Sequence, residues 1–397
     1  MAVDAADVYR AGHPAATLTR ERDGVHFRYL PDFLNSGRPP VATTLPLRED
    51  DLVTPAGAVP SYFAGLLPEG RRLSGLRRAI KASADDELTL LCAVGSDTVG
   101  DVQVFASDEV PAVAEPLVDI GASAHLDFAP LLGEFAPVDR VGLAGAQEKV
   151  SGRMISVPAR RAGERFILKL NPPEYPHVVE NEAFFLGLSR ACGLPTVKSR
   201  LIHDQHGIPA LLITRFDRVS RAGASAALPV EDGCQVLDRW PADKYSLSTE
   251  DVFTALARLC ASELVAARDL FRQLCFALVT GNGDLHAKNV SVVGDDAGEW
   301  HIAPAYDLPS TAFYGDHSLA LSIAGKRVGI SRRRLLDFGE AIGLRRPAAA
   351  RWLDQILTRT GELIPTIEAG ILPFDAGITR TAVRQLRNNR RLLTEGG

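Results

Sequence analysis

The chain has 397 residues, which is enough for roughly two or three domains and a large buried core. Its hydrophobic content of 46% and charged content of 23% are ordinary for a globular protein that folds in water. The net charge of −5 argues against a dedicated nucleic-acid-binding protein. No apolar run approaches the roughly 18 residues that span a membrane. The five cysteines include no C-x-x-C pair, and the N-terminus lacks signal-peptide features, so we expect a cytoplasmic protein.

Residues 1–108 are predicted to form a β-rich subdomain with a helical end. Segments 16–20 and 25–29 alternate apolar and polar residues on either side of an Asp-Gly dipeptide, which is typical of a hairpin. A helix is expected over 84–94. The acidic, proline-containing stretch 108–116 is predicted to be a linker.

Residues 109–216 have a different pattern. The loop 142–149 is rich in small residues, which expose backbone N–H groups. Segments 165–170 and 210–216 are predicted strands, and the predicted helix 179–193 between them ends at a glycine. A small-residue loop ahead of a strand, a helix and another strand is typical of a nucleotide-binding lobe.

Residues 217–397 are predicted to be mainly helical. Ser248 begins a pattern that resembles a capping box. Helices are expected at 248–259, 264–279, 331–342, 347–360 and 376–394, with one strand at 290–293.

The loop after the 264–279 helix contains the most informative residues. Asp284 is followed by Asn289 after four intervening residues, and Asp307 lies beyond a short apolar strand. A carboxylate at the first position can accept a proton from an attacking hydroxyl group, while an amide and a second carboxylate can hold Mg²⁺. Protein kinases use this spacing for phosphoryl transfer. The alternative is an Asx-rich turn between a helix and a strand.

Two more residues fit the same chemistry in chain order. Lys169 lies in an apolar strand, where an unpaired ammonium group is costly to bury, so its head either reaches solvent or meets an anion. Glu182 lies on the next helix, where a lysine-pairing carboxylate is expected. An isolated glutamate on a helix is more often solvated, and the loop 142–149 can equally be an ordinary glycine turn.

Other charged residues have two open interpretations. His286 lies between the two aspartates and is either a metal ligand or a residue that orders the loop. The arginines of the last helix form a solvated face or contact phosphates; they are Arg380, Arg384, Arg387, Arg390 and Arg391.

Several motifs in order show a resemblance to a known family. The residues that match are 63–70 (F-x-x-L-L-P-E-G), 145–149 (G-A-Q-x-K), 181–182 (N-E), 215–218 (R-F-D-R), 231–235 (E-D-x-C-Q), 244–245 (K-Y), 284–289 (D-x-H-x-K-N) and 306–307 (Y-D). By these motifs the chain resembles the HipA family, bacterial toxin kinases of toxin–antitoxin pairs, over nearly its whole length.

The resemblance implies a Ser/Thr protein kinase that uses ATP and Mg²⁺. The expected fold is α+β, a two-lobed protein-kinase-like fold with a β-rich N-terminal subdomain (1–108), an ATP-binding part of the N-lobe (109–216) and a mainly helical C-lobe (217–397). The expected substrate is an aminoacyl-tRNA synthetase, with glutamyl-tRNA synthetase as the first candidate. The expected partner is a small HipB-like helix-turn-helix antitoxin, through which the complex reaches DNA.

The resemblance also assigns site residues. Lys169 contacts the phosphates, Glu182 orients Lys169, Asp284 is the base, and Asn289 and Asp307 hold the metal. Further cofactor contacts are expected at Gly145, Ala146, Gln147, Lys149, Thr214, Phe216, His286 and Lys288. Ala144 departs from the family pattern, because some members have at this position a serine that they phosphorylate on themselves.

Two other functions remain open at this stage. One is a catalytically weak ATP-binding regulator that acts with a helix-turn-helix antitoxin on DNA. The other is a metal hydrolase built on Asp284, His286 and Asp307. Retention of Lys169 and of the residues at 284, 289 and 307 favours an active kinase, because an inactive relative is free to lose them.

Overall fold

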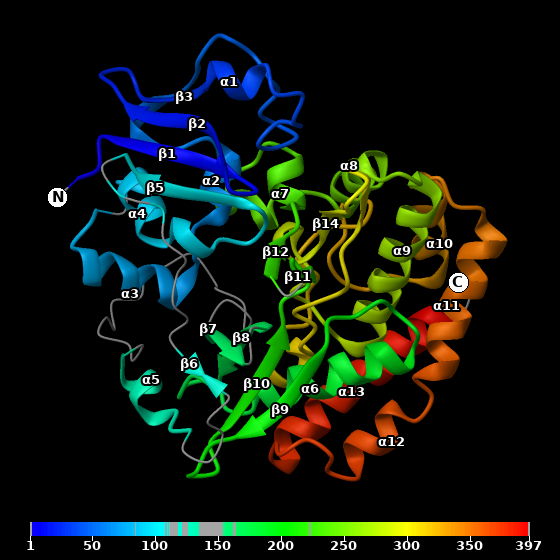
Figure 1. Cartoon of the computed structure of the whole chain (residues 1–397). Coiled ribbons are helices and arrows are strands. Elements are labelled where there is room, and N and C mark those ends of the chain that lie inside the picture. The colour runs from blue at the N-terminus through cyan, green and yellow to red at the C-terminus, as the bar shows by residue number, and fades with distance from the viewer. Residues whose placement is uncertain are drawn as a thin grey trace.

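The computed structural model describes residues 2–83, 85–107, 109, 111, 118–120, 126–134, 154–161, 164–221 and 224–395. Figure 1 shows a sheet formed by the N-terminal residues at the top, a second sheet below it, and a helical region on the right. This arrangement confirms the predicted α+β fold with a β-rich N-terminal part and a mainly helical C-terminal part. The expected loop 142–149 lies outside the described residues, as does most of the expected linker 108–116.

The N-terminal sheet has the strand order β4-β3-β2-β1-β5, and its neighbouring strands are antiparallel. Its strands are β1 Ala5–Arg10, β2 His13–Arg20, β3 Val25–Tyr29, β4 Leu52–Thr54 and β5 Val102–Ala106. The predicted hairpin is confirmed, because Leu18 of β2 pairs with Phe27 of β3. Both side chains are buried in the same core as Val8, so the alternation of the sequence sets the inner face of this sheet.

Helices α1 Pro31–Leu34, α2 Ser61–Leu66 and α4 Glu87–Val94 pack against this sheet. Helix α3 Gly70–Ile80 lies against α4 and against β7 Ile155–Arg161, a strand of the second sheet. The predicted helix 84–94 begins later than expected, because the side chain of Asp86 accepts a hydrogen bond from the backbone N–H of Thr89 and caps α4.

The second sheet has the order β6-β7-β8-β10-β9. Its strands are β6 Val118–Asp119, β7 Ile155–Arg161, β8 Glu164–Leu170, β9 Ser199–His203 and β10 Pro209–Thr214, accompanied by α5 Ala129–Glu134 and α6 Val178–Ala191. Strands β8 and β10 and helix α6 confirm the three elements predicted here. Lys169 pairs with Leu211 on the face toward α6, whereas Leu168 and Leu212 lie in a separate core on the opposite face.

The C-terminal region is built around α9, whose second half is almost entirely buried. Its helices are α7 Gly233–Val236, α8 Thr249–Leu259, α9 Glu263–Thr280, α10 Arg332–Ala341, α11 Arg346–Arg359, α12 Leu363–Glu368 and α13 Ala376–Thr394. Its strands are β11 Arg218–Arg221, β12 Ala224–Ala227, β13 Val230–Asp232, β14 Ser291–Gly294 and β15 Trp300–Ile302. All five predicted helices and the predicted strand are confirmed. Helix α12 was not predicted, because its six residues are too few to show a helical period.

The arginines of α13 are partly explained by contacts within the fold. Arg387 pairs with Glu368, and Arg390 donates to the backbone carbonyl of Leu357 at 2.6 Å. These contacts support the structural interpretation of the arginine-rich helix. None of the described helices combines the length and the hydropathy required to cross a membrane. The division of the chain at residues 108 and 216 stays a prediction.

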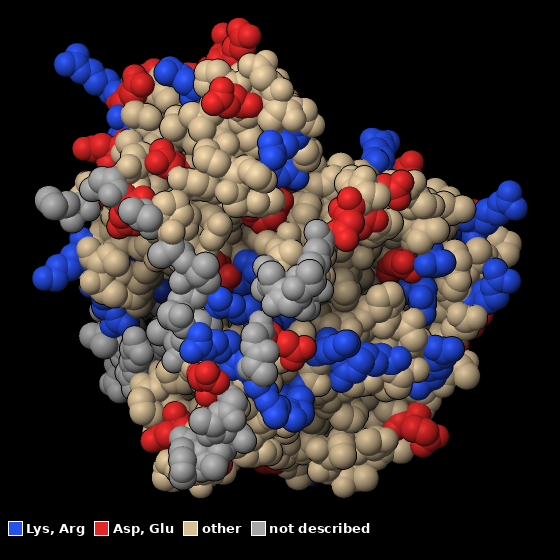
Figure 2. Space-filling model, in the orientation of Figure 1, with Lys and Arg blue, Asp and Glu red and all other residues tan. Residues whose placement is uncertain are grey.

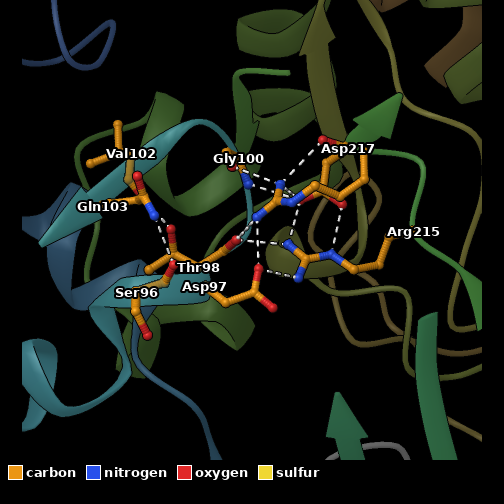
Figure 3. Close-up of polar contacts among 9 residues, drawn as sticks. Ser96, Asp97, Thr98, Gly100, Val102, Gln103, Arg215 and Asp217 are labelled. Carbon is orange, nitrogen blue, oxygen red and sulfur yellow. Dashed lines mark hydrogen bonds and ion pairs between the residues drawn. The ribbon is translucent and has the colours of Figure 1, made fainter. Parts of the chain in front are cut away.

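A buried cluster of charges joins the N-terminal subdomain to the chain segment that follows β10 (Figure 3). Arg215 donates to Asp217 at 2.7 and 3.0 Å and to Asp97 at 2.8 Å. Arg218 bonds the same two carboxylates at 2.8 and 2.9 Å. Asp217 also accepts from the backbone N–H of Gly100 at 3.0 Å. The charges of two guanidinium groups and two carboxylates therefore balance. Asp97, Arg215, Asp217 and Arg218 are called the hinge cluster below, because they lie where the N-terminal subdomain meets the segment after β10.

The hinge cluster predicts a large stability effect for a small chemical change. Asp217 is 3% exposed, so Asp217→Asn leaves two buried arginines with one remaining carboxylate in the cluster. We expect a loss of about 3–5 kcal/mol in the free energy of unfolding, measured by urea denaturation. The control is Arg346→Ala, whose partners Asp337 and Glu340 are 57% and 50% exposed; we expect a change below about 1 kcal/mol. Equal losses in the two variants would contradict this account.

Candidate active site

A buried ammonium group lies between two carboxylates at the junction of β8, α6 and the loop after β15. Nζ of Lys169 donates to both oxygens of Glu182 at 2.8 and 2.9 Å and to Oδ1 of Asp307 at 2.7 Å. The side chain of Glu182 is fully buried. The structure therefore brings Asp307, 138 positions from Lys169, to the Lys169–Glu182 pair, and Lys169 meets an anion rather than solvent.

Burial and the neighbouring charges act in opposite directions on the pKa values of Lys169 and Glu182. Burial alone would lower the pKa of Lys169, but the carboxylates of Asp307 and Glu182 raise it. Burial raises the pKa of Glu182 to about 7, although Lys169 opposes this effect. Lys169 is therefore shared by the carboxylates of Glu182 and Asp307.

The loop that contains Asp284 is rigidly bonded. Helix α9 ends at Gly281, whose φ of +66° turns the chain into the loop. Asp284 is fully buried, and its backbone N–H donates to Oδ1 of Asn282 at 2.8 Å. The amide nitrogen of Asn289 donates to the backbone carbonyl of Asp284 at 2.9 Å and closes the loop. The hydroxyl of Tyr245 lies 3.3 Å from Oδ1 of Asp284.

Asp307 is held by its neighbour as well as by Lys169. Its φ of +53° lies in the left-handed region, which is uncommon for a residue other than glycine. The preceding Tyr306 stacks on Phe216, with ring centroids 5.8 Å apart, and its hydroxyl donates to the backbone carbonyl of Lys288 at 2.8 Å. Tyr306 therefore connects the segment after β10 with the Asp284 loop.

The donor atoms at this site suit a hard divalent cation. Because the amide nitrogen of Asn289 bonds the Asp284 carbonyl, the amide oxygen is the atom that can bind a metal. Asn289 and Asp307 thus offer an amide oxygen and a carboxylate, the ligand types that Mg²⁺ prefers.

His286 behaves as a loop-ordering residue. Its Nδ1 accepts a hydrogen bond from the backbone N–H of Lys288 at 3.2 Å. Among the described residues, two groups of three His, Cys, Asp or Glu side chains have possible metal-ligand atoms within 4.8 Å of one another. Both groups are at least partly exposed, and neither contains Asp284 or His286. The metal-hydrolase hypothesis is therefore not supported by the geometry.

The side chains of Lys288 and Thr214, both predicted to contact the cofactor, are directed away from Lys169 or bonded elsewhere. Nζ of Lys288 donates to the backbone carbonyl of Gly65 at 2.9 Å and to Asp232 at 2.8 Å. The side chain of Thr214 lies opposite Phe166, on the face of the sheet away from Lys169, so only its backbone is placed to meet a nucleotide on the Lys169 side. The remaining predicted contacts Gly145, Ala146, Gln147 and Lys149 lie outside the described residues.

The sequence analysis assigned no role to three residues around Asp284. Lys244 bonds Glu69, and the neighbouring Tyr245 contacts Asp284. Both Glu69 and the Lys-Tyr pair belong to motifs that the resemblance had matched. Their position in those motifs was the only feature of the sequence that could have indicated a role for them.

Comparison with known proteins places the chain in a family. The model of the HipA-like C-terminal domain matches residues 141–364, which is more than half of the chain. The chain belongs to the HipA family. The model of the HipA N-terminal domain matches residues 6–105, so both parts of a HipA protein are present.

Two kinases are similar to this protein over nearly its whole length. Y4mE of Sinorhizobium fredii, classed as a kinase, is 30% identical over 394 residues, which is 92% of each protein. The serine/threonine-protein kinase toxin HipA of Shewanella oneidensis is 25% identical over 92% of this chain and 88% of its own. This HipA protein is accordingly a Ser/Thr kinase, and kinase homology implies ATP.

A solved structure shows the same fold. The Shewanella oneidensis complex of HipA, HipB and operator DNA contains a chain with a TM-score of 0.78 and 22% identity, covering 97% of this chain and 96% of that one. The two-lobed, kinase-like architecture predicted from the sequence is confirmed by this likeness.

His286 predicts a pH dependence of stability. Burial, reinforced by the positive charge of Lys244, lowers the pKa of His286 from 6.5 to about 3. Its contribution is complete above pH 6.5 and is lost as the pH falls, because the unfolded chain takes up a proton that the folded chain refuses. We expect a loss of about 1.4 kcal/mol per pH unit below 6.5, measured by urea denaturation. His286→Gln should remove this part of the slope; an unchanged slope would contradict the assignment.

Proposed function

We propose that this HipA protein transfers the γ-phosphoryl group of ATP to a serine or threonine of a protein, with Mg²⁺ held by Asn289 and Asp307. Asp284 accepts the proton of the attacking hydroxyl group. Lys169, oriented by Glu182, binds the phosphates. A Mg²⁺ ion at this position supplies charge neutralisation on the phosphates.

The contact that supports the proposal best is Lys169 between Glu182 and Asp307, at 2.7 to 2.9 Å. An unpaired buried lysine is unfavourable, and a lysine shared by two carboxylates is not needed to stabilise a sheet. A nucleotide phosphate beside Lys169 and a metal ion beside Asp307 would complete the site. Kinase sites use this arrangement.

For the adenine side we propose the segment that follows β10. Phe216 and Tyr306 are stacked and partly buried there, next to the backbone of Thr214. The aromatic pair offers a stacking surface for a base. The predicted roles of His286 and Lys288 are better described as support for the Asp284 loop than as direct cofactor contacts.

We further propose a toxin role with an aminoacyl-tRNA synthetase as substrate, glutamyl-tRNA synthetase first, and a HipB-like helix-turn-helix antitoxin as partner. The family resemblance supports the substrate, and the HipA–HipB–operator DNA complex of the relative supports the partner. Contact with DNA would be made through the antitoxin. Figure 2 shows that Lys and Arg side chains gather in the lower half of one face, so the net charge of −5 is not evenly spread.

The second candidate function is an ATP-binding regulator with weak catalysis. It predicts nucleotide binding and antitoxin-dependent DNA binding without phosphoryl transfer. The intact contacts of Asp284, Asn289 and Asp307 favour the kinase, because a regulator does not need a proton acceptor held in place.

The kinase proposal predicts that Asp284→Asn abolishes transfer and keeps the fold. The change is nearly isosteric, but it removes the proton acceptor and should lower the rate by about 10²- to 10⁴-fold. The measurement is labelling of host-lysate proteins with γ-labelled ATP, followed by identification of the labelled protein. Wild-type labelling by Asp284→Asn would remove this residue from the base role, and the absence of labelling by the wild type would favour the regulator.

Nucleotide binding has its own expected outcome. ATP with Mg²⁺ should raise the melting temperature, because a ligand that binds only the native state adds RT ln(1 + [L]/Kd) to stability. Asp307→Asn should lose the Mg²⁺-dependent part of this shift and keep a smaller shift with ATP alone. No shift for the wild type at millimolar ATP–Mg²⁺ would argue against both candidate functions.

A further inference from the structure

The N-terminal subdomain touches the Asp284 loop directly through Glu69. Glu69 lies between α2 and α3 and precedes the first residue of α3. One of its carboxylate oxygens accepts a hydrogen bond from Nζ of Lys244. The other oxygen, Oε1, is buried, has no hydrogen-bond partner in the described part of the chain, and lies 3.9 Å from Nζ of Lys288. A single carboxylate thus faces two lysines from the catalytic region.

Each lysine leads to Asp284 or its loop. Lys288 is in the 3₁₀ turn Ala287–Asn289, next to the proposed metal ligand Asn289. Its Nζ donates to Asp232 at 2.8 Å and lies 3.9 Å from Oε1 of Glu69. Lys244 precedes Tyr245, whose hydroxyl lies 3.3 Å from Oδ1 of Asp284.

The backbone of α2 approaches the loop closely enough to fix these contacts. A Cβ atom on Gly65 would lie 2.8 Å from the side chain of Gln235, so only glycine allows α2 to lie against α7 at this distance. The Gly65 carbonyl then accepts from Nζ of Lys288 at 2.9 Å. Gln235 donates to the backbone carbonyl of Tyr62 at 2.9 Å, a second bond across the same junction.

We propose that Glu69 is a positioning residue for phosphoryl transfer: through Lys244 and Lys288 it holds the Asp284 loop, so that the N-terminal subdomain completes the kinase site of its own chain. Glu69 reaches Asp284 and its loop through the two lysines. Its effect is therefore on geometry, and a displacement of the base by about 1 Å can lower a rate about 100-fold.

A purely structural role would look different in experiments. If Glu69 only joins two parts of the chain, its loss lowers stability and leaves the rate per folded molecule unchanged. If it positions the loop, its loss lowers kcat, leaves the KM for ATP nearly unchanged and loosens the loop. The kinetic arm of the test rests on the proposed kinase function, whereas the mobility of the loop is measurable without any activity.

The test uses Glu69→Gln in the full chain, with Asp86→Asn as the matched control. Asp86 is a partly buried carboxylate of the same subdomain that pairs with Arg20 and caps α4. Glu69→Gln should lower kcat for ATP turnover about 10- to 100-fold, with the KM for ATP changed less than about threefold. Amide hydrogen exchange of peptides spanning 281–290 should become faster in Glu69→Gln and stay unchanged in Asp86→Asn.

A double variant separates action through Lys244 from independent effects. If Glu69 acts through Lys244, Glu69→Gln/Lys244→Met should be no slower than the slower single variant, because the two residues share one interaction. Unchanged exchange over 281–290 in Glu69→Gln, or a kcat equal to or above that of the wild type, overturns the proposal. If the wild type itself shows no ATP turnover, the proposed function fails, and the exchange result alone decides whether Glu69 holds the loop.

Discussion

The buried ammonium group of Lys169 is the contact on which the arrangement of the site depends. It joins a strand, a helix and the loop after β15 through bonds of 2.7 to 2.9 Å to Glu182 and Asp307. A buried charge must be paired, so neither carboxylate can leave without a large penalty. Lys169 and Glu182 on one side of the proposed nucleotide site are thereby bonded to Asp307 on the other side before any ligand binds. The carboxylate of Asp307 and the amide oxygen of Asn289 are the atoms that we propose hold a metal ion there.

Two further junctions extend this order into the N-terminal subdomain. The hinge cluster ties Asp97 to Arg215 and Arg218, and Glu69 faces Lys244 and Lys288. Phe216, between two members of the hinge cluster, stacks on Tyr306, which precedes Asp307. A change in the N-terminal subdomain therefore has short contact paths to both the adenine side and the catalytic loop. The N-terminal subdomain is thus bonded to the segments that carry the proposed site.

Much of the fold followed from local patterns. The hairpin of β2 and β3 follows from period-two alternation, and helices α8, α9 and α13 follow from apolar residues at helical spacing. Local patterns failed where the structure is short or capped by one side chain. Helix α12 has too few residues for a period, and α4 begins where Asp86 caps it rather than where the apolar pattern begins. The site residues on which the kinase interpretation depends were found because their spacing is dictated by phosphoryl-transfer chemistry.

By itself, the sequence identified the family by its motifs and, through that resemblance, the α+β class, the candidate base and the candidate metal ligands; its periodicity located the longer helices and several strands. Those properties depend on residue type and on spacing along the chain. Only the tertiary structure decided that Lys169 meets both Glu182 and Asp307, that Lys288 turns toward Gly65, and that Glu69 stands beside two lysines. Such contacts join residues more than 100 positions apart in most cases. No local pattern specifies them, because they are selected by the burial of charge in one particular packing of the chain.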